Sequence, residues 1–111
     1  MKNLRSETMS ILSKHGKTWD DVIGVCGNEF QITKEQFLEL SDILYHNRYG
    51  KQVIAYDLKI VGKDFWLERN EEDGLECWEF KQIPDIANLP TVSIDTLINK
   101  KWGYQSLKQC N

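Results

Sequence analysis

One stretch decides the fold of this chain, VIAYDLKIVGKDFWLERNEEDGLECWEFKQI at residues 53–83. Apolar and polar residues alternate along it, which is typical of β-strands with one buried face. This pattern predicts an antiparallel meander of three strands joined by two tight turns. The strands are expected at about 53–61, 65–71 and 75–83, with two-residue turns at Gly62-Lys63 and Asp73-Gly74.

These turns align the strands so that the apolar side chains share one face. The expected opposed pairs are Ile60/Phe65, Leu58/Leu67 and Tyr56/Arg69 in the first hairpin, and Leu67/Phe80 and Arg69/Trp78 in the second. The predicted core face therefore contains Ile54, Tyr56, Leu58, Ile60, Phe65, Leu67, Trp78 and Phe80. Arg69 is the one charged residue on it, and we expect it at the margin.

Signals for other elements flank the meander. Thr33 and Gln36 form a capping box that starts a helix ending near Asn47. Further helices are expected at 4–15, before Gly16, and at 94–102, between Ser93 and Gly103. Residues 47–52 are expected to be a polar connection, and Gly27-Asn28 a turn that places Val25 opposite Phe30 and Ile23 opposite Ile32. Thr18-x-x-Asp21 is also compatible with a helical turn, so residues 18–27 have two interpretations.

The order of elements predicts an α+β fold, α-ββ-α-βββ-α, in one domain of residues 1–111. An antiparallel sheet is expected, with helices packed on one face. The chain is 41% hydrophobic and has a net charge of −3, which argues against a disordered tail and against a general nucleic-acid binder. No apolar run reaches the length of a membrane span, and three widely spaced cysteines indicate reduced thiols in the cytoplasm.

The opposite face of the meander carries the residues that suggest a function. In the expected register Asp57, Glu68 and Glu79 form one row, and Lys59, Trp66 and Lys81 form the adjacent row. Three interpretations are compatible with these rows. They are a solvated face with lysines pairing the carboxylates, a docking surface centred on the Trp66 indole, and a divalent-metal site at the three carboxylates.

Acidic residues are concentrated in this part of the chain. Residues 64–85 contain eight acids and two bases, whereas the first 17 residues and the segment from Lys100 onward are basic. Such a segment would steer a basic partner. We predict that the partner-binding residues are Asp57, Trp66, Glu68, Glu71, Glu72, Asp73, Glu76 and Glu79.

No phosphate-binding loop or catalytic motif is recognisable, so we expect a non-enzymatic protein without catalytic residues, metal or cofactor. One alternative is a protein that sequesters a small molecule or nucleotide signal, or weakly binds a divalent metal, in a pocket lined by Trp19, Tyr45, Trp78 and Trp102. Another is a self-associating protein, such as a homodimer, that pairs a sheet edge near residues 53–61 or 75–83 between chains.

Two blocks within the meander, residues 57–69 and 73–80, resemble a block found in small proteins of phages and prophages of Gram-positive bacteria. Residues 18–22 and 37–40 are similar to this group as well, so the resemblance covers roughly residues 18–84. It implies an accessory protein in the cytoplasm of the bacterial host, of the kind that often inhibits host defence, including anti-CRISPR proteins. The expected partner is a host protein with a basic or nucleic-acid-binding surface, without direct contact to nucleic acid or membrane.

Overall fold

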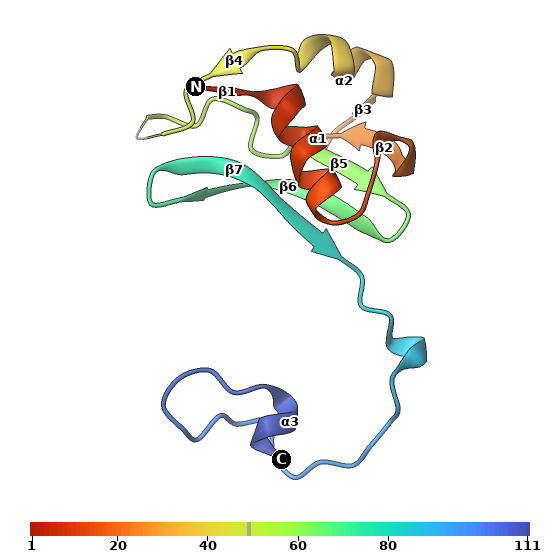
Figure 1. The fold of residues 1–111 in the computed structure, drawn as a ribbon, viewed down its shortest axis with the longest axis vertical. Coiled ribbons are helices and arrows are strands. Elements are labelled where there is room, and N and C mark those ends of the chain that lie inside the picture. Colours follow the sequence, from red (N-terminus) through yellow and green to blue (C-terminus); the bar gives the residue numbers. More distant parts are fainter. Residues whose placement is uncertain (49) are drawn as a thin grey trace.

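An antiparallel sheet of five strands forms the centre of the computed structural model, which describes residues 1–48 and 50–111 (Figure 1). The α+β class with antiparallel sheets is therefore confirmed. In spatial order the strands are β3 (Gln31–Ile32), β2 (Val22–Cys26), β5 (Lys59–Gly62), β6 (Phe65–Glu72) and β7 (Leu75–Gln82). A second sheet pairs β1 (Lys2–Asn3) with β4 (Leu44–Tyr45).

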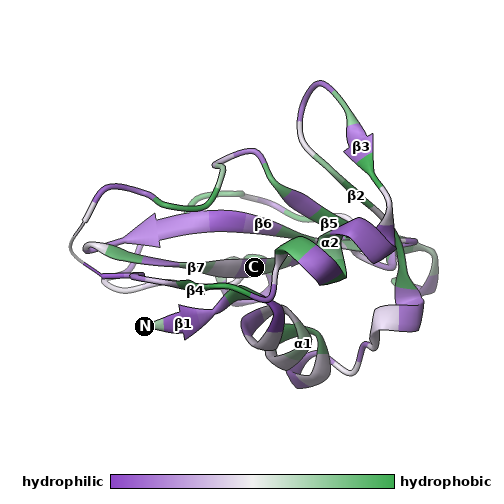
Figure 2. Ribbon diagram, turned by 90° about the horizontal axis from the view of Figure 1, so that it is seen from above, coloured by the Kyte–Doolittle hydropathy of each residue, from purple (hydrophilic) through white to green (hydrophobic). Residues whose placement is uncertain are grey.

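Helix α1 (Leu4–Lys14) lies across one face of the large sheet and confirms the expected helix at 4–15 (Figures 1 and 2). The Asn3 side chain caps it by accepting from the Ser6 amide at 2.9 Å. Gly16 follows the helix with a positive φ of 72°, which suits glycine best. Leu12 of this helix belongs to the core, together with Val25, Ile60 and Leu67 of the sheet.

Helix α2 (Lys34–Leu40) begins as expected, because the Thr33 hydroxyl accepts from the Gln36 amide at 3.0 Å. Its predicted end near Asn47 is wrong. The chain leaves the helix so that β4 can pair with β1, and the carbonyls of Ser41 and Ile43 accept from the first amides of α1. These amides have no partner inside their own helix, so the extended segment satisfies them.

Residues 18–26 combine the two interpretations. A single 3₁₀ turn, η1 (Trp19–Asp21), starts with the Thr18 amide donating to the Asp21 carboxylate at 2.8 Å, and strand β2 follows it. The expected pairs of the next hairpin are wrong, because its loop is two residues longer and Val25 lies opposite Ile32. A bulge between Val22 and Gly24 turns Ile23 to solvent, and Phe30, in the longer loop, is also exposed.

The second hairpin of the meander matches the prediction, with Leu67 opposite Phe80 and Arg69 opposite Trp78. Its turn has positive φ at both Asp73 and Gly74, as a type I′ turn requires. The pairs expected in the first hairpin are wrong. Ile60 lies opposite Leu67, so the register is shifted by two residues and the turn lies at Lys63-Asp64.

Gly62 explains why this turn comes one residue later. A Cβ on Gly62 would lie 2.0 Å from the Phe65 ring, so the strand continues through the glycine and the ring packs against its bare backbone. A shift of two residues keeps every side chain on its face. Strand β5 begins only at Lys59, however, and residues 53–58 form a loop in which Tyr56 is exposed, not part of the core.

The C-terminal arm, residues 84–111, leaves the body after β7 and extends away from it (Figure 1). The last backbone hydrogen bond of the body is donated by the Ile83 amide to the Asp64 carbonyl at 2.8 Å. The arm contributes no buried residue to the core, because all buried core residues among those described lie between Leu4 and Trp78. The radius of gyration is accordingly 17.8 Å, against about 13 Å for a compact chain of this length.

The predicted helix at 94–102 is wrong. Apart from η2 (Ile86–Asn88) and α3 (Leu107–Cys110), the described arm has no regular structure. An isolated helix of this length is marginal in water without an apolar surface to pack on. The connection expected at 47–52 includes Tyr49, which lies outside the described residues.

Candidate protein-binding surface

The face of the large sheet opposite α1 presents two rows of side chains across β5, β6 and β7. Lys59, Glu68 and Glu79 form one row, and Val61, Trp66 and Lys81 form the next. All six side chains are partly exposed, and we call them the open sheet face. Glu68 and Glu79 lie opposite each other as predicted.

Asp57 does not belong to the acidic row. The two-residue shift in register puts Lys59 opposite Glu68, and Asp57 lies in the loop before β5. There its Oδ2 accepts from the Asn28 amide at 2.8 Å and ties this loop to the β2–β3 hairpin. The three carboxylates that one interpretation grouped as a divalent-metal site are therefore not aligned. Across residues 1–48 and 50–111, no group of three or more His, Cys, Asp and Glu side chains is placed to hold one.

Charges on the open sheet face are balanced. The Lys81 ammonium lies 3.1 Å from a Glu79 oxygen and 3.9 Å from a Glu68 oxygen. The Trp66 indole N–H donates to Glu68 at 3.4 Å. Of the two lysines expected to pair with carboxylates on a solvated face, Lys81 does so and offsets the like charges of Glu68 and Glu79, whereas Lys59 donates to the Asp57 carbonyl.

A shallow hollow of about 230 Å³ lies over the neighbouring strands of the same sheet. It is lined by Ile23, Gly24, Val25, Cys26, Gln31 and Val61. Gly24 is paired with Val61, which is in turn paired with Trp66, so a residue without a side chain lies two strands away from the indole. An amphipathic aromatic beside a recess is the composition that protein interfaces use for their strongest contacts.

The acidic tip, Glu71, Glu72 and Asp73, lies at the end of the β6–β7 hairpin. All three residues are exposed. Glu71 also holds the turn, since its Oε1 accepts from the Gly74 amide at 2.7 Å. A hollow of about 320 Å³ beside the tip is lined by Arg48, Glu72, Asp73, Gly74, Leu75 and Cys77.

Glu76 is not part of this exposed surface, although its position near the tip suggested that it was. The residue is 3% exposed and faces the core side of the sheet. Its two carboxylate oxygens accept from the Val53 and Ile54 amides at 2.9 and 3.0 Å. The Arg69 guanidinium donates to the same carboxylate at 2.9 Å. Glu76 therefore anchors the loop before β5 and is unavailable to a partner.

Arg69 lies inside the molecule, not at its margin as predicted. Its side chain is fully shielded and donates to Tyr45 Oη at 2.9 Å, while the Tyr45 hydroxyl donates to Glu7. Its guanidinium carbon lies 4.6 Å from the centre of the Trp78 ring. Burial by itself would lower the pKa of Arg69, but Tyr45, Glu7 and Glu76 outweigh it and raise the pKa.

Glu7 of α1 was not recognised from the sequence as part of this cluster. Its Oε2 lies 3.5 Å from Arg69 Nη1 and accepts from the Trp78 amide at 3.2 Å. The alternation along β7 places Glu76 and Trp78 on the same face, which is a signal for a buried partner of Arg69. No local signal connects either residue to Glu7, which is 62 positions away from Arg69.

The free edge of β7 is occupied over its first half, which contradicts edge pairing between chains there. The Glu76 amide donates to the Asn47 carbonyl at 2.8 Å, and the Trp78 amide donates to Glu7. The other edge proposed for pairing, residues 53–61, is not an edge strand: residues 53–58 form a loop, and β5 lies between β2 and β6. The Glu76 and Trp78 amides, which could otherwise pair with a strand of a second chain, are thus already hydrogen-bonded.

The four aromatic residues that the alternative function placed around a ligand pocket do not come together. Tyr45 and Trp78 are buried around Arg69, and Trp19 stacks on Phe37 with ring centres 5.5 Å apart. Trp102 lies in the C-terminal arm and is fully exposed. These residues therefore support core packing in the body, and the alternative of a shared pocket loses its basis.

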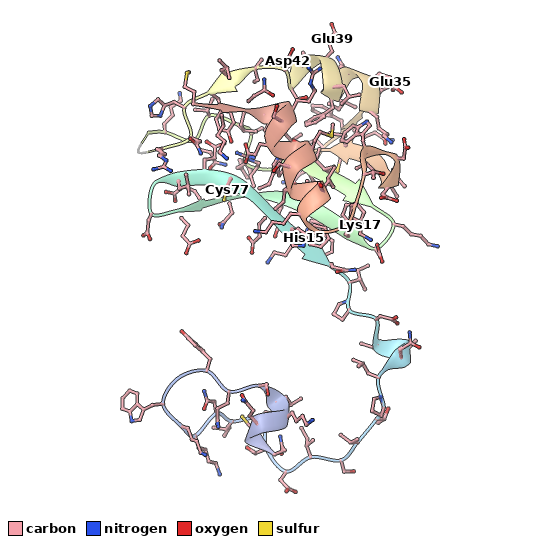
Figure 3. All side chains as sticks on the ribbon, viewed as in Figure 1. His15, Lys17, Glu35, Glu39, Asp42 and Cys77 are labelled. Carbon is pink, nitrogen blue, oxygen red and sulfur yellow. The ribbon has the colours of Figure 1, made fainter. Side chains whose placement is uncertain are left out.

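Reactive side chains lie apart from one another. His15 stacks on Phe80 with ring centres 4.0 Å apart, at the end of α1, and Cys77 lies on β7 (Figure 3). Burial, followed by the charge of Glu7, raises the pKa of the Cys77 thiol. The neutral thiol, which is a poor nucleophile, is thereby favoured.

No described helix combines the length and the apolar composition needed to cross a membrane. No family model matches the chain, and no curated protein or solved structure shows significant similarity to it.

Proposed function

We propose that this protein is a non-enzymatic binding protein that docks the open sheet face and the acidic tip on a basic surface of another protein. The observation that carries this proposal is the partly exposed Trp66, which lies on the sheet face opposite α1. Indole rings in such positions contribute large amphipathic area at interfaces.

The two parts of the surface have different roles in this proposal. The ion pairs of Lys81 with Glu68 and Glu79 balance the charge around Trp66, so the open sheet face contributes mainly contact area. The unbalanced charge is at the acidic tip, at the end of two paired eight-residue strands. Charge in such a position raises the association rate with a basic partner, and salt weakens this attraction. Burial of the indole mainly lowers the dissociation rate of the complex.

The resemblance of residues 57–80 to phage and prophage proteins supports a more specific form of the proposal. The partner is then a host defence protein with a nucleic-acid-binding groove, such as a CRISPR nuclease, and the protein acts in the cytoplasm of the host bacterium. Carboxylates at the acidic tip would occupy basic sites that otherwise contact phosphates.

Affinity capture from lysate of the bacterial host tests this proposal with three variants. Trp66→Ala and Glu72→Lys are expected to reduce capture of the same protein, and raised salt is expected to weaken binding. Glu39→Lys is the matched control, because it makes the same charge change on α2, away from the β6–β7 hairpin (Figure 3). Equal capture by all three variants would place the binding site elsewhere.

A further inference from the structure

The C-terminal arm exposes more apolar surface than a segment without a partner normally keeps. Trp102 and Tyr104 are fully exposed, and Leu97 is 78% exposed. Other exposed apolar residues of the arm are Ile86, Leu89, Val92, Ile94, Ile98 and Leu107. Burial of such side chains is the main driving force of association, so the arm has the composition of a docking segment.

The body has an apolar cleft of about 170 Å³ between the β2–β3 hairpin and the loop before β5. We call it the β2–β3 cleft; its apolar lining comprises Phe30, Ile32, Ala55 and Leu58. Phe30 is 71% exposed and therefore offers an uncovered ring to a ligand. Two acids, Glu29 and Asp57, also line the cleft.

The arm and the cleft match in chemistry. Residues 100–104 read Lys-Lys-Trp-Gly-Tyr, so two cations directly precede two exposed aromatic side chains. The cleft offers apolar side chains together with two carboxylates. The arm, residues 84–111, contains three bases and two acids, whereas residues 1–83 contain 11 bases and 15 acids. Attraction between arm and body thus favours contact.

The placement of the arm and the cleft at opposite edges of the sheet favours a second copy of the chain as the occupant of the cleft. The arm leaves from β7 at one edge of the five-stranded sheet, and the cleft lies at β2 and β3, at the other edge. The arm extends away from its own body (Figure 1). We propose that residues 100–104 of one copy dock in the β2–β3 cleft of a second copy, so that two chains exchange arms reciprocally about a two-fold axis.

This inference is independent of the proposed function, because neither the arm nor Glu29 belongs to the open sheet face or the acidic tip. The protein is expected to be a dimer by size-exclusion chromatography with light scattering. Glu29→Lys alone, and Lys100→Glu combined with Lys101→Glu, are each expected to shift the dimer to monomer. Trp102→Ala should weaken the dimer at least tenfold in dissociation constant.

Mixing the two charge variants provides the decisive measurement. In an equimolar mixture the unchanged lysines of one variant meet the unchanged Glu29 of the other, and the introduced glutamates meet the introduced lysine. A heterodimer should therefore reappear. Glu39→Lys, the matched charge change on α2, should remain dimeric.

Circular dichroism establishes that each variant is folded, which is expected because Glu29 and residues 100–102 are all exposed. A monomeric full-length protein at every accessible concentration would overturn the proposal, and so would a dimer that ignores both charge variants. A monomer in which the emission of Trp102, taken as the difference from Trp102→Ala, is blue-shifted would instead show that the arm folds back on its own body, which also contradicts exchange between copies.

Discussion

The Arg69 guanidinium donates to the Glu76 carboxylate at 2.9 Å, and both side chains are almost completely shielded from solvent. A second carboxylate, Glu7, approaches the same guanidinium at 3.5 Å. Backbone amides of Val53, Ile54 and Trp78 donate to the two acids and compensate the additional negative charge. This cluster joins α1, the loop before β5 and the β6–β7 hairpin.

Arg69→Leu should strongly destabilise the protein, because it leaves Glu7 and Glu76 buried without their cation. Breaking a buried pair by removing one partner costs about 3–5 kcal/mol. Urea unfolding followed by tryptophan fluorescence measures the loss. Lys81→Met is the control, since its ion pairs are exposed and contribute at most about 1 kcal/mol. Similar losses for the two variants would contradict the structural role of Arg69.

Tyr45 makes the stability of the protein sensitive to alkaline pH. Burial and the hydrogen bond to Glu7 raise the pKa of Tyr45 above its ordinary value of 10.0. The unfolded chain therefore loses this proton near pH 10, while the folded protein keeps it. Because the unfolded state then binds fewer protons, the free energy of unfolding falls as the pH rises above 10, and the contribution is complete below that pH.

Tyr45→Phe tests this dependence, because the variant has no proton to lose at this position. Thermal unfolding between pH 8 and about 11.5 should show a shallower decline for the variant than for the unchanged protein. At neutral pH the variant should be less stable by about 1.5–3 kcal/mol, because it loses hydrogen bonds to the charged groups of Arg69 and Glu7. Parallel declines in both proteins would show that other groups cause the alkaline loss.

Two glycines of the sheet should respond differently to the same substitution. Gly62→Ala places a Cβ 2.0 Å from the Phe65 ring, so the core must shift, at a cost of about 1–3 kcal/mol. Gly24→Ala meets no atom within 4 Å and should change stability by less than about 0.5 kcal/mol. Chemical denaturation of both variants compares them directly, and an equal cost would contradict the packing at Gly62.

Two tryptophans on opposite faces of the same hairpin should separate stability from binding. Trp78→Ala should cost about 3–5 kcal/mol, because it removes a buried ring that packs on Arg69 and donates to the Thr8 hydroxyl at 2.9 Å. Trp66→Ala, on the open sheet face, should cost much less. Thermal melts of both variants give the comparison, and a large loss at Trp66 would mean that its ring has a structural role.

Several elements could be predicted from neighbouring residues. Thr33 caps α2, Gly16 follows α1, and Asp73-Gly74 forms the turn between β6 and β7, because each depends on contacts within about four residues. Alternation also identified most of the core face of the meander. In the candidate surface, the positions of Trp66, Glu68 and Glu79 on the opposite face follow from the same alternation.

Other features depended on residues far apart in the chain. Alternation has a period of two, so it cannot distinguish registers that differ by two residues, and the packing of Phe65 on Gly62 decided that shift. The burial of Glu76 and Arg69 required Glu7 and Tyr45, which the fold brings from the first helix and from β4.

The sequence by itself determined the α+β class, the starts of α1 and α2, the second hairpin and the faces of its strands, because these depend on local geometry and on periodicity. The tertiary structure decided the register of β5, the position of Asp57, the buried charge cluster and the absence of regular structure at residues 94–102. The physical reason is that these features depend on which distant surfaces are available for packing. Residues 94–102 have the caps of a helix, but Ile94, Leu97 and Ile98 are exposed and pack on no apolar surface of the body.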